Sequence, residues 1–216
     1  VGLIDCEFDR DALRNGAVSL LHARGVMPDG LPFRFPEDPL PEPLDVRDRF
    51  SPTAHSHRIL LAIPAQRPGR ANTALDGVDP GDARFLSAEA DIPDETTGQD
   101  DRTVQLARKN FRLFLESEVP EGSVTLPLAR LTRDGAGAFM YDPEFIPPSL
   151  RVGASPRLLT ELVRLPVMLQ AMADSLAAER AEGSDGEGEI VSFWLSHTVQ
   201  SAIPPLRHHI WTRATH

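Results

Sequence analysis

Residues 1–30 read VGLIDCEFDRDALRNGAVSLLHARGVMPDG, and this stretch decides the class of fold. Over the first eight positions, apolar residues alternate with a set that is richer in acids. A period of two predicts a strand with one face on a core. The predicted core-facing set is Gly2, Ile4, Cys6 and Phe8.

Outward from this strand, the same stretch predicts a helical turn and a second strand. Asp9–Gly16 fits one turn, because an aspartate can accept from the free amides at its start and Asn-Gly suits a left-handed end. Ala17–Met27 predicts a strand. The Pro-Asp-Gly sequence that begins at Pro28 then predicts a turn into a short extended return over Phe33–Phe35. We expect a hairpin-like unit here.

Further strands are predicted where apolar runs lie between turn signals. The candidates are Arg58–Gln66, apolar enough for burial on both faces, Ala83–Ala90, Arg102–Glu118, Ser123–Thr132 and Ala138–Tyr141, the last two as parts of a meander. Arg102–Glu118 also fits a helical face, and strand is the interpretation adopted. Between these runs, the proline-rich Pro36–Pro43 predicts a surface connection, and the six acids of Glu89–Asp101 predict a solvated, mobile loop.

Twenty of the 216 residues are proline, against a usual share of about 5%, and this density disfavours long helices over most of the chain. The sequence pattern changes from strands and turns to helical periodicity after Ser155. Ser155 suits a helix N-cap before Pro156. Apolar residues then recur at helical spacing, with a kink expected at Pro166, a flexible linker over Gly183–Glu189, and a second helix from Ile190 that Pro204-Pro205 interrupts. The sequence therefore predicts a mainly β chain with an α-helical tail, divided into domains 1–155 and 156–216.

Two helices cannot bury their apolar stripes alone, so the tail is expected to pack on further helices or on copies of itself. The candidate residues for this oligomer interface are Leu162, Leu169, Met172, Phe193 and Trp194.

Charge and composition exclude several classes of partner. The formal net charge of −10 has the wrong sign for a nucleic-acid binder. The longest apolar runs, such as Ile59–Ala65, are far shorter than the roughly 20 residues of a membrane span. A single cysteine and a start at Val1 without a signal peptide indicate a reducing cytoplasm. Because Val1 replaces an initiator Met, we expect a piece of a longer protein.

No assembled active site is visible in the sequence, and no cofactor or metal is predicted. A zinc site needs three or four converging ligands, often with thiolates or carboxylates among them. The patterns around His55, His57 and His208-His209 do not match such a ligand set. Cys6 falls on the apolar face of its strand, where a thiolate is disfavoured. Glycine-rich nucleotide-binding loops and a serine nucleophile elbow are also missing. The protein is therefore not predicted to be an enzyme.

The segment Phe145-Ile146-Pro147-Pro148 places apolar residues among rigid prolines. Such a segment either wedges a loop onto the core or presents an apolar patch to a partner, and both alternatives stay open.

Several pieces of the sequence, in order, resemble one family, the TssK (ImpJ) baseplate subunits of bacterial type VI secretion systems. They are Val1-Gly2-Leu3-Ile4, Arg24 to Gly30, Leu113 to Glu118, Leu126 to Arg130, and Asp142 to Pro148 with Ala154-Ser155. The resemblance implies a β-sandwich similar to the shoulder domain of siphophage receptor-binding proteins, followed by the start of a helical bundle. The family's opening segment and its C-terminal head are missing from this sequence.

The resemblance also implies a structural function without catalysis. A homotrimer would dock to the baseplate wedge subunits TssF and TssG. It would connect them to the inner-membrane complex of TssJ, TssL and TssM through the head, at the cytoplasmic face of the inner membrane. Two alternatives of other classes are a carbohydrate-binding, adhesin-like sandwich, which is short of stacking aromatics, and a hydrolase that uses His55 or His57.

Overall fold

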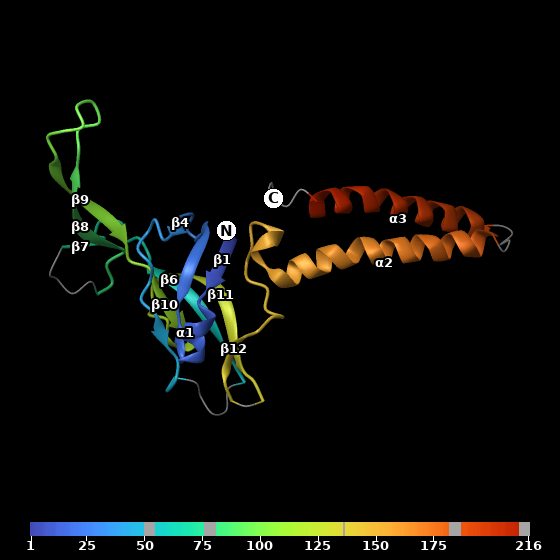
Figure 1. Ribbon diagram of the computed structural model, residues 1–216, viewed down its shortest axis with the longest axis horizontal. Helices are drawn as coiled ribbons and strands as arrows, with labels where there is room; N and C mark the ends of the chain where they lie inside the picture. The colour runs from blue at the N-terminus through green and yellow to red at the C-terminus, as the bar shows by residue number, and fades with distance from the viewer. Residues whose placement is uncertain (50–54, 76–80, 136, 182–186, 212–216) are drawn as a thin grey trace. The chain divides into compact units, whose positions relative to one another are not determined.

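The computed structural model describes residues 1–49, 55–75, 81–135, 137–181 and 187–211. The chain divides into two compact units, Val1–Leu150 and Arg151–His216. Strands build the first unit, and two long helices build most of the second (Figure 1). The prediction of a mainly β chain with a helical tail is confirmed. The likeness to a siphophage shoulder and the domain ranges 1–155 and 156–216 stay predictions.

The elements of the first unit follow one another as short strands with two small helices. They are β1 (Gly2–Phe8), α1 (Arg10–Arg14), β2 (Ala17–Val18), β3 (Leu20–Val26), β4 (Pro32–Phe35), β5 (Leu44–Asp45), β6 (Ser56–Pro64), β7 (Thr73–Ala74), β8 (Phe85–Ile92), β9 (Arg102–Lys109), β10 (Arg112–Leu115), η1 (Glu116–Glu118), β11 (Ser123–Arg133) and β12 (Phe139–Tyr141).

The first sheet has the order β1-β3-β4, with antiparallel neighbours. Helix α1 begins where predicted, because the Asp9 carboxylate accepts from the backbone N–H groups of Asp11 at 2.8 Å and Ala12 at 3.0 Å. The prediction of one strand over Ala17–Met27 is wrong. The chain breaks at Ser19, whose carbonyl accepts from the Asp9 N–H at 2.9 Å. As a result β2 pairs with β5, and β3 pairs with β1 and β4.

The predicted alternation in β1 is only partly right. Leu3, which was placed on the outer face, is fully buried, whereas Ile4 and Cys6 are only partly buried. The pairing of β1 with β3 shifts register between Leu3 and Asp5. An extra residue at such a bulge interrupts the period of two, so the alternation changes phase at this point.

The second sheet has the order β10-β6-β11-β12. β6 is one of its two inner strands, and the residues from Ile59 to Ile63 are buried on both faces, as predicted. The predicted meander holds for β11 and β12, but β6 lies between β10 and β11. The strand prediction for 102–118 is confirmed with a correction: the run is two strands, β9 and β10, that join different sheets on either side of Asn110.

Aromatic side chains join the two sheets in one core. The rings of Phe33 and Phe35 from β4 lie 5.7 and 5.5 Å from the ring of Phe111, next to β10. The ring of Phe8 from β1 lies 4.7 Å from that of Tyr141 in β12. Aromatic pairs at such separations add stability beyond the area they bury, which favours this alignment of the sheets.

A third sheet, of order β7-β8-β9, extends away from the other two (Figure 1). The loop predicted over Glu89–Asp101 is shorter in the structure, because β8 continues to Ile92 and β9 starts at Arg102. The residues between them are all exposed, as a solvated tip requires.

The second unit contains η2 (Val152–Ala154), α2 (Pro156–Ala181) and α3 (Glu187–Trp211). Ser155 caps α2 as predicted, since its Oγ accepts from the Leu158 N–H at 3.4 Å. Residues 187–189 of the predicted linker belong to α3, and 183–186 lie outside the described residues. Pro204-Pro205 do not interrupt α3. The carbonyls that they leave without a helical donor, at Gln200 and Ser201, belong to exposed residues, where water can satisfy them.

Candidate interaction surfaces

The segment that follows β12 adds an edge to the first sheet. The Leu3 N–H donates to the Pro148 carbonyl at 2.8 Å, and the Leu150 N–H donates to the Leu3 carbonyl at 2.7 Å. Ser149 thereby forms a parallel bridge with Leu3. Gly2 allows this approach, because a Cβ at that position would lie 2.8 Å from the backbone of Pro148. At Leu3, the outer edge of β1 is therefore paired by the chain itself.

Charged contacts shape the start of this segment. The Arg130 Nε donates to the Asp142 carboxylate at 2.6 Å, and the other oxygen of Asp142 accepts from the Glu144 N–H at 2.9 Å. The Arg130 guanidinium also lies 5.6 Å from the centre of the Phe145 ring. A cation over a ring face is attracted by the ring's electrons, so Phe145 is held against β11.

The four residues singled out in the sequence are divided between core and surface. Pro147 is buried and Phe145 is half-buried, which fits the wedge. Ile146 is 45% exposed and Pro148 is exposed, which fits the patch. Two exposed residues, Val1 and Leu150, belong to the same sheet edge and were not singled out. We call Val1, Ile146, Pro148 and Leu150 the edge patch. Val1 and residues 146–150 lie far apart in the sequence. The pairing of Pro148 and Leu150 with Leu3 brings these two parts of the edge patch to the same strand.

The two long helices of the second unit lie side by side (Figure 1). They bury one apolar stripe against each other. Its buried members are Ala173, Leu176, Val199 and Ile203. Of the five residues predicted for the oligomer interface, Leu162 and Leu169 are half-buried, while Met172, Phe193 and Trp194 are exposed.

Other exposed apolar side chains of these helices were not singled out in the sequence. They are Val163, Leu165, Val167, Met168, Ile190, Val191 and Leu195. The sequence pattern could have identified them, because these apolar residues fall outside the stripe that a single helix pair can bury. A surface this apolar is typical of a helix face that meets another protein chain.

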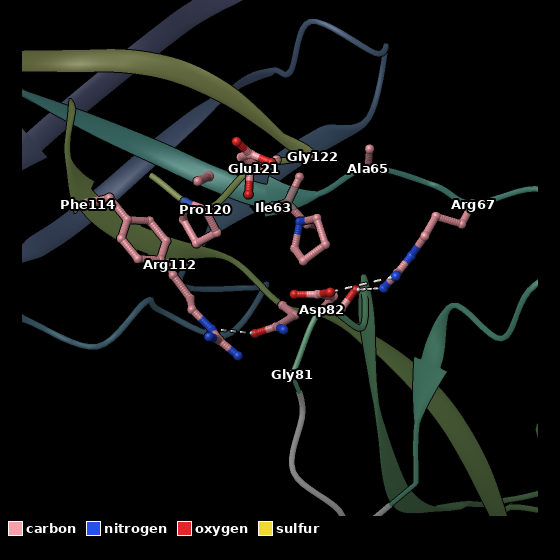
Figure 2. A pocket seen from close by; sticks show the side chains of 14 residues that line it. Ile63, Ala65, Arg67, Gly81, Asp82, Arg112, Phe114, Pro120, Glu121 and Gly122 are labelled. Atoms are coloured by element: carbon pink, nitrogen blue, oxygen red, sulfur yellow. Dashed lines mark hydrogen bonds and ion pairs between the residues drawn. The ribbon is translucent and has the colours of Figure 1, made fainter. Parts of the chain in front are cut away.

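A cavity of about 170 Å³ lies at the ends of β6, β10 and β11 (Figure 2). Phe114, Pro120 and Ile63 supply much of its apolar wall. Two of its charged groups are paired with each other: Arg67 donates to the Asp82 carbonyl at 2.6 Å and lies 3.7 Å from its carboxylate.

The histidines and the cysteine that were considered as metal ligands or nucleophiles do not form such a site among the described residues. In the part of the chain that the structure describes, no three His, Cys, Asp or Glu side chains converge as metal ligands would. Burial, together with the neighbouring Asp5 and Glu7, raises the pKa of the Cys6 thiol to about 12, so this thiol is a poor nucleophile. Burial also raises the pKa of Tyr141, whose ring packs on Phe8.

Neither long helix, over its described residues, has an apolar stretch sufficient to cross a bilayer.

Comparisons with known proteins agree on one family. The family model described as "Bacterial Type VI secretion, VC_A0110, EvfL, ImpJ, VasE" matches residues 1–216. The chain is 30% identical over 205 residues to the type VI secretion system baseplate component TssK1 of Pseudomonas aeruginosa PAO1, covering 93% of this chain and 45% of that protein. It therefore spans about half the length of this relative.

Solved structures of the same kind share the fold. A crystal structure of TssK matches with a TM-score of 0.80 and 28% identity, over 97% of this chain and 49% of that one. A cryo-electron microscopy structure of a TssK-TssF-TssG baseplate subcomplex contains a chain that matches with a TM-score of 0.81 and 28% identity, over 97% of this chain and 67% of that one.

Proposed function

The chain belongs to the bacterial type VI secretion family of ImpJ and VasE, and from this premise we propose that it is a structural component of the type VI secretion baseplate. The observation that carries the proposal is the likeness, over nearly the whole chain, to TssK in its subcomplex with TssF and TssG. A scaffolding role needs surfaces rather than a catalytic centre. The raised pKa of the Cys6 thiol and the pairing of Arg67 with Asp82 are compatible with such a role.

The partners of the first unit are the wedge subunits TssF and TssG. The edge patch supports this assignment, because exposed apolar residues beside a covered sheet edge offer area for burial without unpaired backbone groups. Phe145 and Pro147 anchor the patch from beneath, and Ile146 and Pro148 would meet the partner. The tethering of Phe145 by Arg130 supports a patch whose shape is set before binding.

The second unit would join copies of the chain in a homotrimer. Support comes from the exposed apolar side chains that remain after α2 and α3 have packed on each other, among them Val167, Val191 and Trp194. Helices from other copies would remove these residues from water, at a gain of roughly 25 cal/mol per Å² of apolar area. Leu162, Leu169, Met172 and Phe193 would contribute to the same bundle.

The finer role is to connect the baseplate with the inner-membrane complex of TssJ, TssL and TssM, at the cytoplasmic face of the inner membrane. The resemblance assigns this contact to a C-terminal head, so no residue of the present sequence is proposed for it.

The test is binding of the purified chain to a co-purified TssF–TssG complex from the same bacterium. The wild-type chain should bind, and Ile146→Asp should weaken binding at least tenfold, because it places a carboxylate in an apolar contact. Leu40→Asp is the matched control, since Leu40 is also 45% exposed but lies in the Pro36–Pro43 connection. No binding by the wild-type chain would refute the proposed role. An equal loss in both variants would refute the edge patch.

The carbohydrate-binding alternative predicts glycan-array signals above background. The single tyrosine of the chain, Tyr141, is engaged with Phe8 and half-buried, so no specific observation favours this function.

A further inference from the structure

The ribbon formed by β8 and β9 has two chemically different faces. Directly opposed residues of an antiparallel pair project to the same side, and successive pairs alternate between sides. One side carries the pairs Ser87 with Ala107, Glu89 with Gln105, and Asp91 with Thr103. The Thr103 hydroxyl donates to the Asp91 carboxylate at 2.6 Å on this polar side.

The other side is almost entirely apolar. Its residues are Leu86, Ala88, Ala90 and Ile92 from β8 and Val104 and Leu106 from β9, which we call the arm face. None of these side chains is buried, and Ile92 and Leu106 are each 44% exposed. In Figure 1 the ribbon extends away from the two larger sheets, and within the described residues β8 and β9 make their main contacts with each other and with β7.

An arginine stands at each end of the arm face. Arg102 lies opposite Ile92 near the tip, and Arg108 lies opposite Leu86 near the base. Both are exposed, and within the described residues neither side chain has an ion pair or hydrogen bond. They are six positions apart on β9, which is roughly 20 Å at the usual rise of a β-strand. Two cationic side chains without an ion pair among the described residues therefore stand at the ends of an exposed or half-buried apolar strip.

The base of the ribbon is fixed, so the arm face has a defined position. Arg84, which is 4% exposed, donates to the Asp29 carboxylate at 2.5 Å and to the Pro64 carbonyl at 2.7 Å. On the neighbouring strand, the Lys109 ammonium donates to Asp38 at 2.9 Å. A surface that is oriented before binding loses less conformational entropy when it binds.

We propose that the arm face is a docking surface for a wedge subunit, TssF or TssG, that presents an apolar strip between two carboxylates about 20 Å apart. This inference rests on the proposed function, which supplies the partner. A second copy of the same face is the wrong occupant. A two-fold axis can stack two arm faces with like ends together or with opposite ends together. Because both ends carry an arginine, either arrangement brings ends of like charge together, which opposes association.

The test measures the affinity of the full chain for the purified TssF–TssG complex by biolayer interferometry. The substitutions Ile92→Ser with Leu106→Ser remove apolar area from the arm face. The substitutions Glu89→Ser with Gln105→Ser change the same number of residues on the polar side and serve as the control. The arm-face variant should raise the Kd at least tenfold, and the control should change it less than twofold.

A third variant, Arg102→Ser with Arg108→Ser, should weaken binding and reduce its dependence on salt between 50 and 500 mM, because the ion pairs it removes are the screened ones. Circular dichroism should give similar melting temperatures for all variants, since every substituted residue is exposed or half-exposed. Wild-type binding with equal Kd in the arm-face variant and the control would overturn this inference alone. Failure of the wild-type chain to bind would overturn both this inference and the proposed function.

Discussion

Leu3 and Leu150, which lie at opposite ends of the first unit's sequence, are joined by a backbone hydrogen bond of 2.7 Å from the Leu150 N–H to the Leu3 carbonyl. With the bond from Leu3 to Pro148, this contact fastens the end of the β unit onto its first strand. The last residues before the helical unit are therefore anchored to a buried part of the first sheet. Any change that separates Gly2 from Pro148 should loosen that anchor.

Gly2→Ala should destabilise the first unit by about 1 to 3 kcal/mol. The backbone at Gly2 has a φ of 138°, which disfavours any side chain, and the new Cβ would lie 2.8 Å from the Pro148 carbonyl group. Urea denaturation followed by near-ultraviolet and far-ultraviolet circular dichroism measures the change. Gly135→Ala is the control, because a Cβ there meets no atom within 4 Å, and it should cost less than about 0.5 kcal/mol. Equal effects of the two substitutions would contradict the role of this close approach.

Arg84→Ala should cost about 3 kcal/mol or more in the free energy of unfolding, because it leaves Asp29 and the Pro64 carbonyl without their buried donor. Asp29→Ala should have a similar cost, since it leaves the buried Arg84 cation without its counter-ion. The double substitution Arg84→Ala with Asp29→Ala should cost clearly less than the sum of the two single substitutions, because neither charge is then left without its partner. A double mutant that is as unstable as the sum of the two singles would show that the pair is not coupled.

Cys6 should resist alkylation in the folded chain. With its thiol pKa raised to about 12, only about one molecule in 10⁴ carries a thiolate at pH 8. Iodoacetamide should therefore react at least a hundredfold more slowly with the native chain than with the chain in 8 M urea. Because Cys6 is the only cysteine, mass spectrometry reads this site alone. Native labelling as fast as that of the unfolded chain would refute the raised pKa.

Self-association should depend on the exposed faces of the helix pair. Val167 is 68% exposed and Val191 is 67% exposed, so Val167→Glu with Val191→Glu should lower the mass measured by multi-angle light scattering without loss of ellipticity at 222 nm. Val199→Glu is the contrasting variant. Val199 lies buried between α2 and α3, and a carboxylate there should lower the helix content itself. A wild-type mass equal to one chain at high concentration would refute the trimer.

Much of the fold could be predicted because the signals for it are local. Asp9 caps the helix that follows it, the apolar run in β6 is buried on both faces, and Ser155 starts α2. Each of these depends on residues a few positions apart, through caps, periodicity or length. The candidate surfaces were predictable to the same degree. Ile146 and Trp194 were singled out, whereas the arm face was hidden by the acids around it, which pointed to a loop.

The amino-acid sequence by itself determined where most strands and helices begin, and that they bury apolar faces. The tertiary structure alone decided which strands are neighbours: β6 lies between β10 and β11, and Pro148 to Leu150 pair with β1. It also decided that the apolar residues of β8 and β9 share one face, which is exposed or half-buried among the described residues. The physical reason is the range of the forces involved. Caps and periodicity act between residues close in the chain, whereas a sheet hydrogen bond joins any two segments that a shared core brings together.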